Sequence, residues 1–516
     1  MIKNNLQPIY ISILIIIGIL IGKIDTNSSK KEIKKSKVDN ILMLIEDHYV
    51  DSIQITFEDE IIESILKKLD PHTTYISKKE YQTVNESMSG EFSGIGIEFN
   101  IIKDTIVVIS PISNGPSERL GIISGDRIVN IDDKVFIGFE NSDVIKNLRG
   151  KKNTSVSVDI KRRGVEELIN YNIKREKIPI FSVDVSLMID SITGYIKINR
   201  FSATTVREFK NALDKLNDHN LKNLILDFRD NPGGYLNAAA SICDIFLEKG
   251  ELIVFTEGRN REKNEIIATS KSSLKETNLV ILINEGSASA SEIVAGAIQD
   301  NDRGIVIGRR SFGKGLVQEE INLKDGSAIR LTTQRYFTPA GRCIQKEYGI
   351  SNKNYFMEQY QRVDSIIPDS LKFKTRLGRT VYGGGGINPD FIVNRDTSLS
   401  FRKINYIFSK GWISDFSLLY SEKHKSRIID NKDTANNLLS KEFNNKERNL
   451  ILNSFNKYID EVWGEKKQSL DQKEEKYILT QIQSRVWRNL FGNEAFYNIL
   501  HLQDNYIEKA KEVLNH

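Results

Sequence analysis

Short apolar runs and amphipathic stretches alternate along residues 176–395, and this alternation predicts the main fold. Residues 221–228 and 279–283 are aliphatic runs with the length and composition of buried strands. Residues 206–216 place apolar side chains at helical spacing, and residues 292–298 predict a helix whose apolar residues face one way. Strands that alternate with helices indicate an α/β core, so we expect a multidomain α/β protein with its main sheet in this region.

Residues 88–175 show a different pattern, in which short alternating runs are broken by glycine and proline. The runs predict strands at 105–109, 155–161 and 168–173, and a short helix at 142–148. We therefore expect a small β-rich domain inserted ahead of the α/β core.

Helices are expected towards both ends of the chain. Residues 27–87 begin with a polar, lysine-rich linker and continue into a helical region with a predicted helix at 57–69. Residues 396–516 show only amphipathic helical patterns, such as 447–462 and 477–499. We assign this C-terminal extension no chemistry and expect a helical cap or a contact in a homo-oligomer.

Residues 1–26 have the composition of a signal or anchor segment. Lys3 is followed by an almost wholly apolar stretch at 9–21, which fits a signal-peptide core. Extending that stretch to 6–24 gives nearly the length of about 20 residues that a membrane span needs. No small-x-small cleavage site follows it, which favours an uncleaved anchor in the inner membrane with the remaining chain in the periplasm. A cleaved signal is the alternative.

Composition narrows the classes of function that remain. The net charge is only +4 over 516 residues, and no basic patch indicates nucleic-acid binding. The two cysteines, Cys243 and Cys343, form neither a disulfide framework nor a zinc pattern, although one disulfide between them remains open. Cys243 lies in an apolar helical run and is expected to pack in the core.

A small-residue turn at 284–291 carries the candidate chemistry. It joins the predicted strand at 279–283 to the following helix, which would place a serine hydroxyl at the end of a sheet beside the amides of a helix N-terminus. That arrangement suits a nucleophile whose intermediate carries an oxyanion. The simpler alternative is that Ser287 or Ser291 only caps the helix.

The base that would serve such a serine is left open by the residues alone. Lys314 lies between Gly313 and Gly315, and burial would lower its pKa enough for a neutral amine to accept a proton. Taken alone, Lys314 fits a solvated surface charge better. His72 or His219 also stays open as the base, because folding can bring either residue to the serine. Residues 308–314 also fit a phosphate-binding loop, but Gly315 stands where that loop needs a hydroxyl for magnesium.

Five separated motifs resemble the carboxyl-terminal processing serine peptidases, also called tail-specific proteases. They occur in this order along the chain: LDPHTTYIS at 69–77, LDFRDNPGG at 226–234, SASASEIVAGAIQD at 287–300, FGKGLVQ at 312–318 and LTTQRYFTPAGRCIQ at 331–345. The resemblance implies Ser289 as nucleophile, Lys314 as general base and Gln318 as the residue that orients the lysine. No metal or cofactor is needed for such a Ser–Lys mechanism.

The oxyanion hole is expected from two segments. The turn after the strand at 221–228 allows a close backbone approach, so the amide of Gly233 or of Gly234 is one donor. The amide of Ala290, directly after the implied nucleophile, is the second. An ordinary strand-to-helix turn is the alternative for the glycine segment.

The β-rich domain at 88–175 resembles a PDZ domain. PDZ domains bind an extended peptide as an added strand and hold its terminal carboxylate on backbone amides. The residues implied here are Gly94, Ile95, Gly96 and Ile97. Substrates would be exported proteins with unstructured, apolar C-terminal tails. A structural domain that covers the site, or a catalytically silent peptide-binding scaffold, is the alternative.

The resemblance covers roughly residues 41–393 and implies a Ser–Lys protease core at 176–395. It departs from the family at 346–379, where a polar stretch is inserted before the segment GGGGINPD at 383–390. We interpret this insertion as a feature of the lineage.

Overall fold

The computed structural model describes residues 57–516 except for 270–271, 273, 350–351, 362–367, 396–400, 430–444, 465–468 and 516, together with five isolated positions before Phe57. Apart from Ser12, the expected signal or anchor segment at 1–26 lies outside the described residues. No helix within the described part of the chain is both long and apolar enough to cross a bilayer. The chain divides into two compact units, residues 1–65 and 66–516.

The helix predicted at 57–69 is shorter in the structure. Helix α3 spans Phe57–Leu66, and the next three residues form turns, with the Leu69 amide donating to the Leu66 carbonyl at 3.0 Å. Asp70 then accepts hydrogen bonds from the amides of His72 and Thr73 at 2.8 and 2.9 Å. The chain therefore leaves the helix before the segment 70–72.

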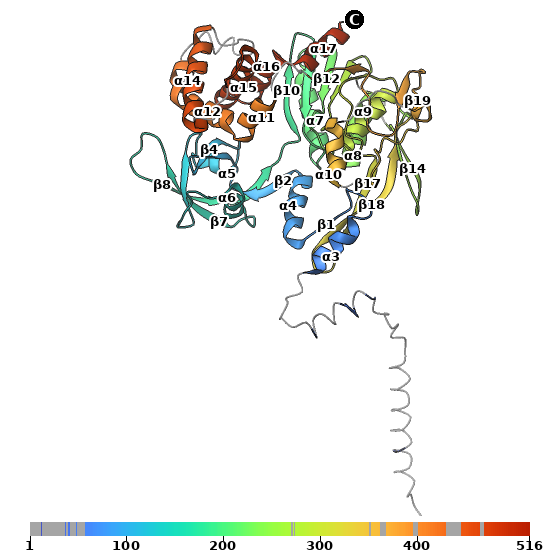
Figure 1. The fold of residues 1–516 in the computed structure, drawn as a ribbon, viewed down its shortest axis with the longest axis horizontal. Helices are drawn as coiled ribbons and strands as arrows, with labels where there is room; N and C mark the ends of the chain where they lie inside the picture. The colour runs from blue at the N-terminus through green and yellow to red at the C-terminus, as the bar shows by residue number, and fades with distance from the viewer. Residues whose placement is uncertain are drawn as a thin grey trace, which may run out of the picture. The chain divides into compact units, whose positions relative to one another are not determined.

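A six-stranded sheet forms the centre of the second unit (Figure 1). Its last five strands in spatial order are parallel, and only the first edge strand is antiparallel. The spatial order is β10 (Val183–Met188), β11 (Thr193–Ile198), β12 (Asn223–Asp227), β15 (Asn278–Ile283), β16 (Ile305–Gly308) and β21 (Phe391–Ile392). The α/β core predicted from the alternating pattern is confirmed.

Both faces of this sheet are covered, because successive strand residues point to opposite sides. Leu226 and Ile281 belong to the core that includes α7 (Thr205–Asn217), α8 (Leu236–Phe246) and α9 (Ala290–Asp300). Ile225, Val280 and Leu282 instead pack with Tyr506 and Ile507 of α17 (Asn505–Leu514). The last helix of the C-terminal extension thus completes the core of the main sheet.

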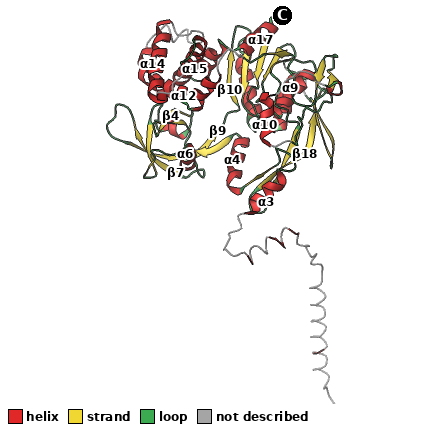
Figure 2. Ribbon diagram, in the orientation of Figure 1, coloured by secondary structure: helices red, strands yellow, loops and turns green. Residues whose placement is uncertain are grey.

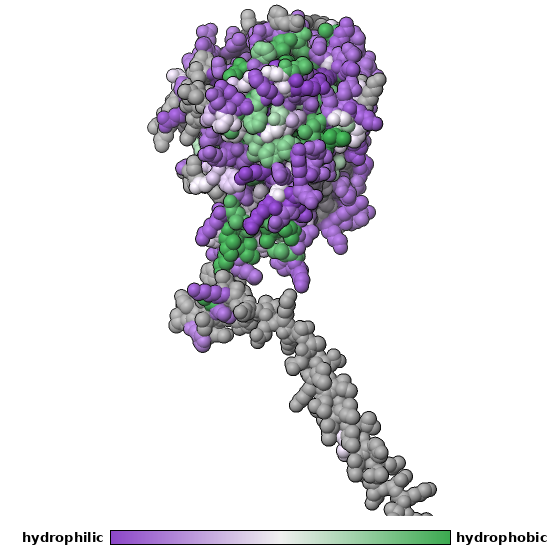
Figure 3. All heavy atoms as spheres, turned by 90° about the vertical axis from the view of Figure 1, so that its right-hand side faces the viewer, coloured by the Kyte–Doolittle hydropathy of each residue, from purple (hydrophilic) through white to green (hydrophobic). Residues whose placement is uncertain are grey.

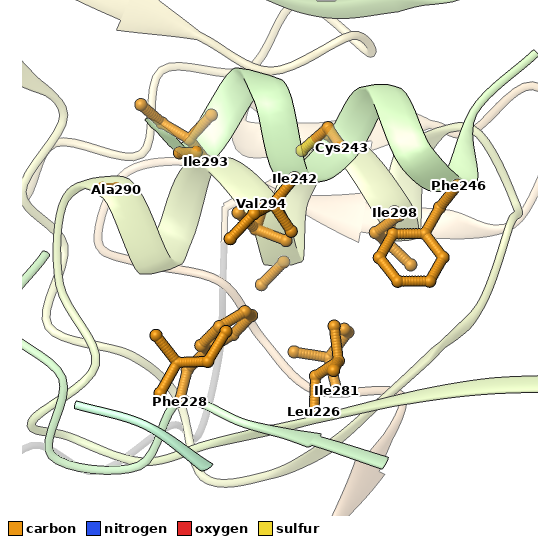
Figure 4. Close-up of a cluster of buried hydrophobic side chains, with 14 of the residues drawn as sticks. Leu226, Phe228, Ile242, Cys243, Phe246, Ile281, Ala290, Ile293, Val294 and Ile298 are labelled. Carbon is orange, nitrogen blue, oxygen red and sulfur yellow. The ribbon is translucent and has the colours of Figure 1, made fainter. Parts of the chain in front are cut away.

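Helix α9 is buried on every side. All eleven of its residues are buried, so the prediction that its apolar residues face one way was wrong. Figure 4 shows Ile293, Val294 and Ile298 of α9 beside α8 and the strand residues Leu226 and Ile281. A Cβ added at Gly296 would lie 2.8 Å from the Thr338 side chain, which shows how closely the opposite side is packed.

Cys243 is fully buried in α8, as its apolar surroundings predicted. Both cysteines are free thiols, so the disulfide left open by the sequence does not form in this structure.

A second sheet carries the strand that follows Lys314. Its antiparallel strands are β1 (Thr74–Ile76), β18 (Ala328–Phe337), β13 (Leu252–Gly258) and β14 (Arg261–Ile267), and β17 (Leu316–Asn322) pairs with β18. Strand β1 comes from the segment LDPHTTYIS, so this N-terminal motif lies in the same sheet as the lysine's strand.

The β-rich domain has the elements that its sequence predicted. Its sheet has the order β3 (Ile97–Ile102), β4 (Thr105–Pro111), β5 (Arg127–Ile131), β7 (Ser155–Lys161) and β8 (Ile169–Lys174), and β6 (Lys134–Val135) pairs with β5. Helices α5 (Pro116–Arg119) and α6 (Asn141–Leu148) belong to the same domain. The entering strand β2 (Glu91–Gly94) pairs with the leaving strand β9 (Glu176–Pro179).

The C-terminal extension is helical, and Figure 2 shows most of its helices grouped together. The helices are α11 (Phe401–Ser409), α12 (Trp412–Ile429), α14 (Asn445–Trp463), α15 (Gln472–Phe491), α16 (Asn493–His501) and α17. The pattern predicted as one helix at 477–499 is divided at Gly492, whose φ of 87° ends α15.

The C-terminal extension also contacts the β-rich domain. Asp415 of α12 accepts a hydrogen bond from Asn100 of β3 at 2.7 Å.

Figure 3 shows one face of the molecule, on which hydrophilic side chains predominate and hydrophobic ones form smaller areas. This distribution fits a chain whose large apolar side chains are gathered in separate buried cores.

Loss of the apolar contact between α17 and the sheet should destabilise the protein. Ile507 is 2 % exposed, so we expect Ile507→Ala to lower the free energy of unfolding by about 2–4 kcal/mol. Leu502→Ala, at a side chain that is 47 % exposed, is the matched control and should change little. Urea denaturation measures both, and equal effects would contradict a packing contribution from α17.

Candidate active site

Ser289 lies where the main sheet meets α9. Strand β15 ends at Ile283, a short turn follows, and α9 begins at Ala290, directly after the serine. Ser289 has φ 56° and ψ −113°, a backbone conformation that non-glycine residues rarely adopt. The residue is partly exposed while its neighbours Ala288 and Ala290 are buried. A strained turn therefore presents this serine at the end of a strand, as a nucleophile requires.

The two neighbouring serines attach the turn to the loop after β12. The Ser287 hydroxyl accepts from the Asn284 amide at 2.9 Å and donates to the Phe228 carbonyl at 2.8 Å. The Ser291 hydroxyl donates to the Asn231 carbonyl at 3.0 Å. Their hydrogen bonds hold the loop that contains the two candidate glycines against the serine turn, whereas Ser289 is the serine that faces outward.

Gly233 lies close to both Ser289 and Ala290. A Cβ added at Gly233 would lie 2.8 Å from both the Ala290 nitrogen and the Ser289 Cβ, so only glycine fits here. The Gly233 amide donates to Asn231 Oδ1 at 2.9 Å. Gly234 packs against the Phe201 carbonyl instead, where an added Cβ would lie 2.0 Å from the oxygen. All three residues predicted for the oxyanion hole lie in this region, and the assignment of donors stays a prediction.

Lys314 is largely buried, and burial lowers its pKa to about 8, with the positive charge of Arg330 as a further cause. Its ammonium donates to Gln318 Oε1 at 2.8 Å. Gln318 in turn donates through Nε2 to the carbonyl of His72. The interpretation of Lys314 as a solvated surface charge was wrong, because the side chain is desolvated and held by a glutamine four residues along.

Glu292 joins the serine turn to the lysine loop, and the sequence predictions missed it. One carboxylate oxygen accepts from the amides of Ser289 and Lys314 at 2.8 and 2.9 Å. The other accepts from the Ser311 hydroxyl at 2.5 Å and the Gly313 amide at 2.7 Å. Glu292 is 0 % exposed, and burial raises its pKa against the opposing effect of these four donors. The available signal was a glutamate three residues after the serine, directly before an apolar run.

No hydrogen bond joins the Ser289 hydroxyl to the Lys314 ammonium, both of which are among the described residues. The two loops nevertheless meet, because Glu292 binds the main-chain amides of both residues. The arrangement brings a partly exposed hydroxyl and a lysine of lowered pKa to the same junction.

Neither histidine left open as a base contacts the serine. The His72 ring bonds the Tyr355 hydroxyl at 2.9 Å and packs against Phe312 and Phe356. Burial lowers the pKa of His72 to about 4, followed by the charge of Lys314. His219 is exposed after the end of α7. The ring of His72 is therefore packed away from the serine, and its carbonyl accepts a hydrogen bond from Gln318.

The predicted peptide-binding segment forms a loop between β2 and β3. The carbonyl of Ile95 accepts from the Ser117 amide at 3.2 Å, and that of Gly96 accepts from the Ile112 amide at 2.9 Å. The carbonyls therefore point into the domain. Strand β3, which starts at Ile97, is an edge strand of its sheet. Gly94 ends β2, and the peptide-binding assignment of this loop stays a prediction.

The segment at 308–314, which fits a phosphate-binding loop in sequence, is not followed by the helix that such a loop requires. Residues 309–315 form a loop after β16, and the chain then enters strand β17 instead of a helix. A phosphate-binding loop places its phosphates at a helix N-terminus, so the structure disfavours nucleotide hydrolysis at this segment.

Two regions of the chain match known protein families. Residues 192–353 match the peptidase family S41, and residues 93–173 match the PDZ domain. A probable CtpA-like serine protease of Staphylococcus aureus (strain N315) is 33 % identical over 430 residues, which cover 82 % of this chain and 83 % of that protein. A carboxy-terminal-processing protease of Bartonella bacilliformis is 37 % identical over 294 residues, which cover 56 % of this chain and 67 % of the relative.

Among solved structures, the chain is similar to a photosystem II D1 C-terminal processing protease, with 25 % identity and a TM-score of 0.37. The match covers 69 % of this chain and 86 % of that structure. A PDZ domain of a carboxy-terminal protease from Vibrio cholerae, solved with a peptide, is 23 % identical and covers 17 % of this chain and 97 % of that structure, with a TM-score of 0.16.

Replacing Glu292 should loosen the junction between the two loops. In Glu292→Gln one acceptor oxygen becomes an amide donor, which leaves buried donors without an acceptor. We expect the free energy of unfolding to fall by about 2–4 kcal/mol, since each unsatisfied buried group costs about 1–3 kcal/mol. Glu265→Gln, at an exposed residue of β14, is the control for denaturation measurements. An unchanged stability would show that the carboxylate does not hold the loops together.

Proposed function

The chain belongs to peptidase family S41 and is a serine peptidase with a PDZ domain, and we propose that Ser289 is its nucleophile and Lys314 its general base. The observation that carries this proposal is the desolvated Lys314 amine, held by Gln318 beside the strained turn of Ser289. A lysine with a pKa of about 8 has a substantial neutral fraction near neutral pH, and only the neutral amine accepts a proton.

In the proposed mechanism, neutral Lys314 takes the hydroxyl proton of Ser289 as the oxygen attacks the scissile carbonyl. The amide of Ala290, the first of α9, has no acceptor within its own helix and stabilises the oxyanion together with a glycine amide of the 233–234 segment. Protonated Lys314 then gives its proton to the leaving amine. Water hydrolyses the acyl-enzyme by the same proton transfers in reverse order.

Gln318 holds the Lys314 amine before the reaction. In this structure the ammonium donates to Gln318 and makes no hydrogen bond to Ser289, so proton transfer requires the amine to turn to the hydroxyl. Glu292 supports this step by fixing the main chain at both residues. Gln318 and Glu292 are positioning residues in this mechanism.

We propose that the substrates are proteins cut near or from their C-terminal tails, with the tail bound by the PDZ domain. The name of the Bartonella relative, carboxy-terminal-processing protease, supports the position of cleavage. The loop of Ile95 and Gly96 supports tail capture, since its carbonyls are occupied inside the domain and β3 is an edge strand of its sheet. Unstructured tails with apolar ends are the expected ligands.

We also propose that the protein acts on exported substrates from the periplasmic side of the inner membrane. The support is the apolar stretch at 9–21, which follows Lys3 and lacks a cleavage site. Homo-oligomer formation through the C-terminal extension stays a prediction.

The dyad is tested by substitution and by the pH dependence of cleavage. Ser289→Ala and Lys314→Ala should each lower kcat/KM by roughly 10³-fold or more on an unstructured protein with an apolar tail. Ser241→Ala and Lys324→Ala, at exposed positions, are the matched controls and should keep full activity. In the unsubstituted protein, kcat/KM should rise with pH below about 8 and then level off, because the neutral fraction of Lys314 rises with pH.

Two results would reject the dyad. Full activity in Lys314→Ala would remove the lysine from the mechanism, and a histidine would then have to be tested. Absence of cleavage by every version, with tail peptides still bound, would favour a peptide-binding scaffold.

Tail capture is tested with two peptides of the same apolar sequence, one with a free C-terminal carboxylate and one amidated. Binding to the Ser289→Ala protein should be about tenfold weaker for the amidated peptide, because backbone amides of the 94–97 loop would lose a charged acceptor. Fluorescence anisotropy measures both Kd values. Equal Kd values would rule out recognition of the terminal carboxylate.

A further inference from the structure

The inserted segment at 346–379 packs against both catalytic loops. Its helix α10 (Asn352–Gln361) carries Tyr355, which is 3 % exposed and forms a buried cluster with Ala288 and Phe312. Ala288 directly precedes Ser289, and Phe312 lies two residues before Lys314. The insertion is therefore in contact with the catalytic centre.

Two neighbouring residues fix Tyr355 in this position. The ammonium of Lys346 donates to the Tyr355 carbonyl at 2.7 Å and lies 4.0 Å from the centre of the Phe312 ring. Gln345 donates through Nε2 to the Tyr355 hydroxyl at 3.1 Å and accepts from the Gly315 amide at 2.8 Å. The tyrosine is thus tied to the loop that contains Lys314.

The hydroxyl of Tyr355 is directed at His72. Because Gln345 donates to this hydroxyl, the hydroxyl's own proton is available for His72 Nε2, 2.9 Å away. A neutral imidazole can accept it, and the pKa of His72 is about 4, lowered first by burial and then by Lys314. Tyr355 therefore anchors the ring of His72.

The main chain of His72 continues this connection to the lysine. Its carbonyl accepts from Gln318 Nε2, and Gln318 Oε1 accepts from the Lys314 ammonium at 2.8 Å. Asp70 holds the same loop by accepting from the amides of His72 and Thr73. His72 thus connects α10 to the lysine, because its ring bonds Tyr355 and its main-chain carbonyl bonds Gln318.

We propose that Tyr355 is a positioning residue for Lys314, acting through His72 and Gln318. The inference rests on the proposed function of Lys314 as general base. Tyr355 and His72 both lie outside residues 192–353, the part that matches the peptidase family. The insertion is in this way a working part of the catalytic centre, and it keeps the lysine amine held and shielded from water.

The expected consequence concerns the pKa of Lys314. Burial is the largest cause of its lowered value, and Arg330 of β18 lowers it further, while Asp70 and Glu292 raise it. His72 is neutral and adds no charge near neutral pH. Loss of the Tyr355 anchor would admit water to the amine, so the pKa of Lys314 should rise towards its ordinary value.

The test measures kcat/KM against pH for the full chain and for Tyr355→Phe, which removes only the hydroxyl. We expect the rising limb to move to higher pH by about half a unit, which lowers kcat/KM about threefold at pH 7. Activity should recover at higher pH. Tyr382→Phe, in strand β20 (Thr380–Tyr382) after the insertion, is the matched control and should leave the profile unchanged.

His72 provides a second variant pair. His72→Gln keeps a side-chain acceptor for the tyrosine hydroxyl and should retain most activity, whereas His72→Ala should reproduce the shifted profile. An unchanged profile in Tyr355→Phe, or an equal loss at every pH, would overturn the proposal. Failure of the proposed dyad can be told apart from failure of the Tyr355 proposal. Full activity in Lys314→Ala would reject the dyad, whatever the result for Tyr355→Phe.

Discussion

The buried carboxylate of Glu292 is the interaction on which the catalytic centre depends. It accepts four hydrogen bonds from two segments that are separated in sequence, and two of the donors are the amides of Ser289 and Lys314. A buried carboxylate without such partners would be strongly disfavoured, so the serine turn and the lysine loop must both be in place for the group to be satisfied. Stability and the geometry of the site are therefore linked through one residue.

The burial that surrounds Glu292 also lowers the pKa of Lys314. The same water-excluding surroundings that raise the pKa of the carboxyl lower that of the amine, because each charged form is disfavoured. These surroundings are assembled from distant parts of the chain: α9, strand β17, the N-terminal loop at Asp70 and His72, and the inserted helix α10. Helix α17 supports them from the opposite face of the main sheet, where Ile507 packs on the strands.

The hydrophobic pattern of the sequence was enough to predict the α/β core and the β-rich domain. Buried strands such as 279–283 are short and aliphatic, and the family resemblance points to Ser289, Lys314 and Gln318. The packing partners of each helix were harder to predict than the helices and strands themselves. Nothing in residues 292–298 shows that α9 is covered on every side, and nothing in the amphipathic pattern near residue 507 shows which face of the sheet it covers.

The positioning roles that the sequence did not indicate share a physical reason. Glu292, His72 and Tyr355 act through main-chain groups or through one another, and such contacts depend on how loops meet in space. A motif records side chains that react, whereas the groups that hold a reacting side chain can be drawn from any loop that packs beside it. In this protein that support includes the segment at 346–379, which follows strand β18. The segment at 346–379 thus contributes to this centre through the contacts of Tyr355.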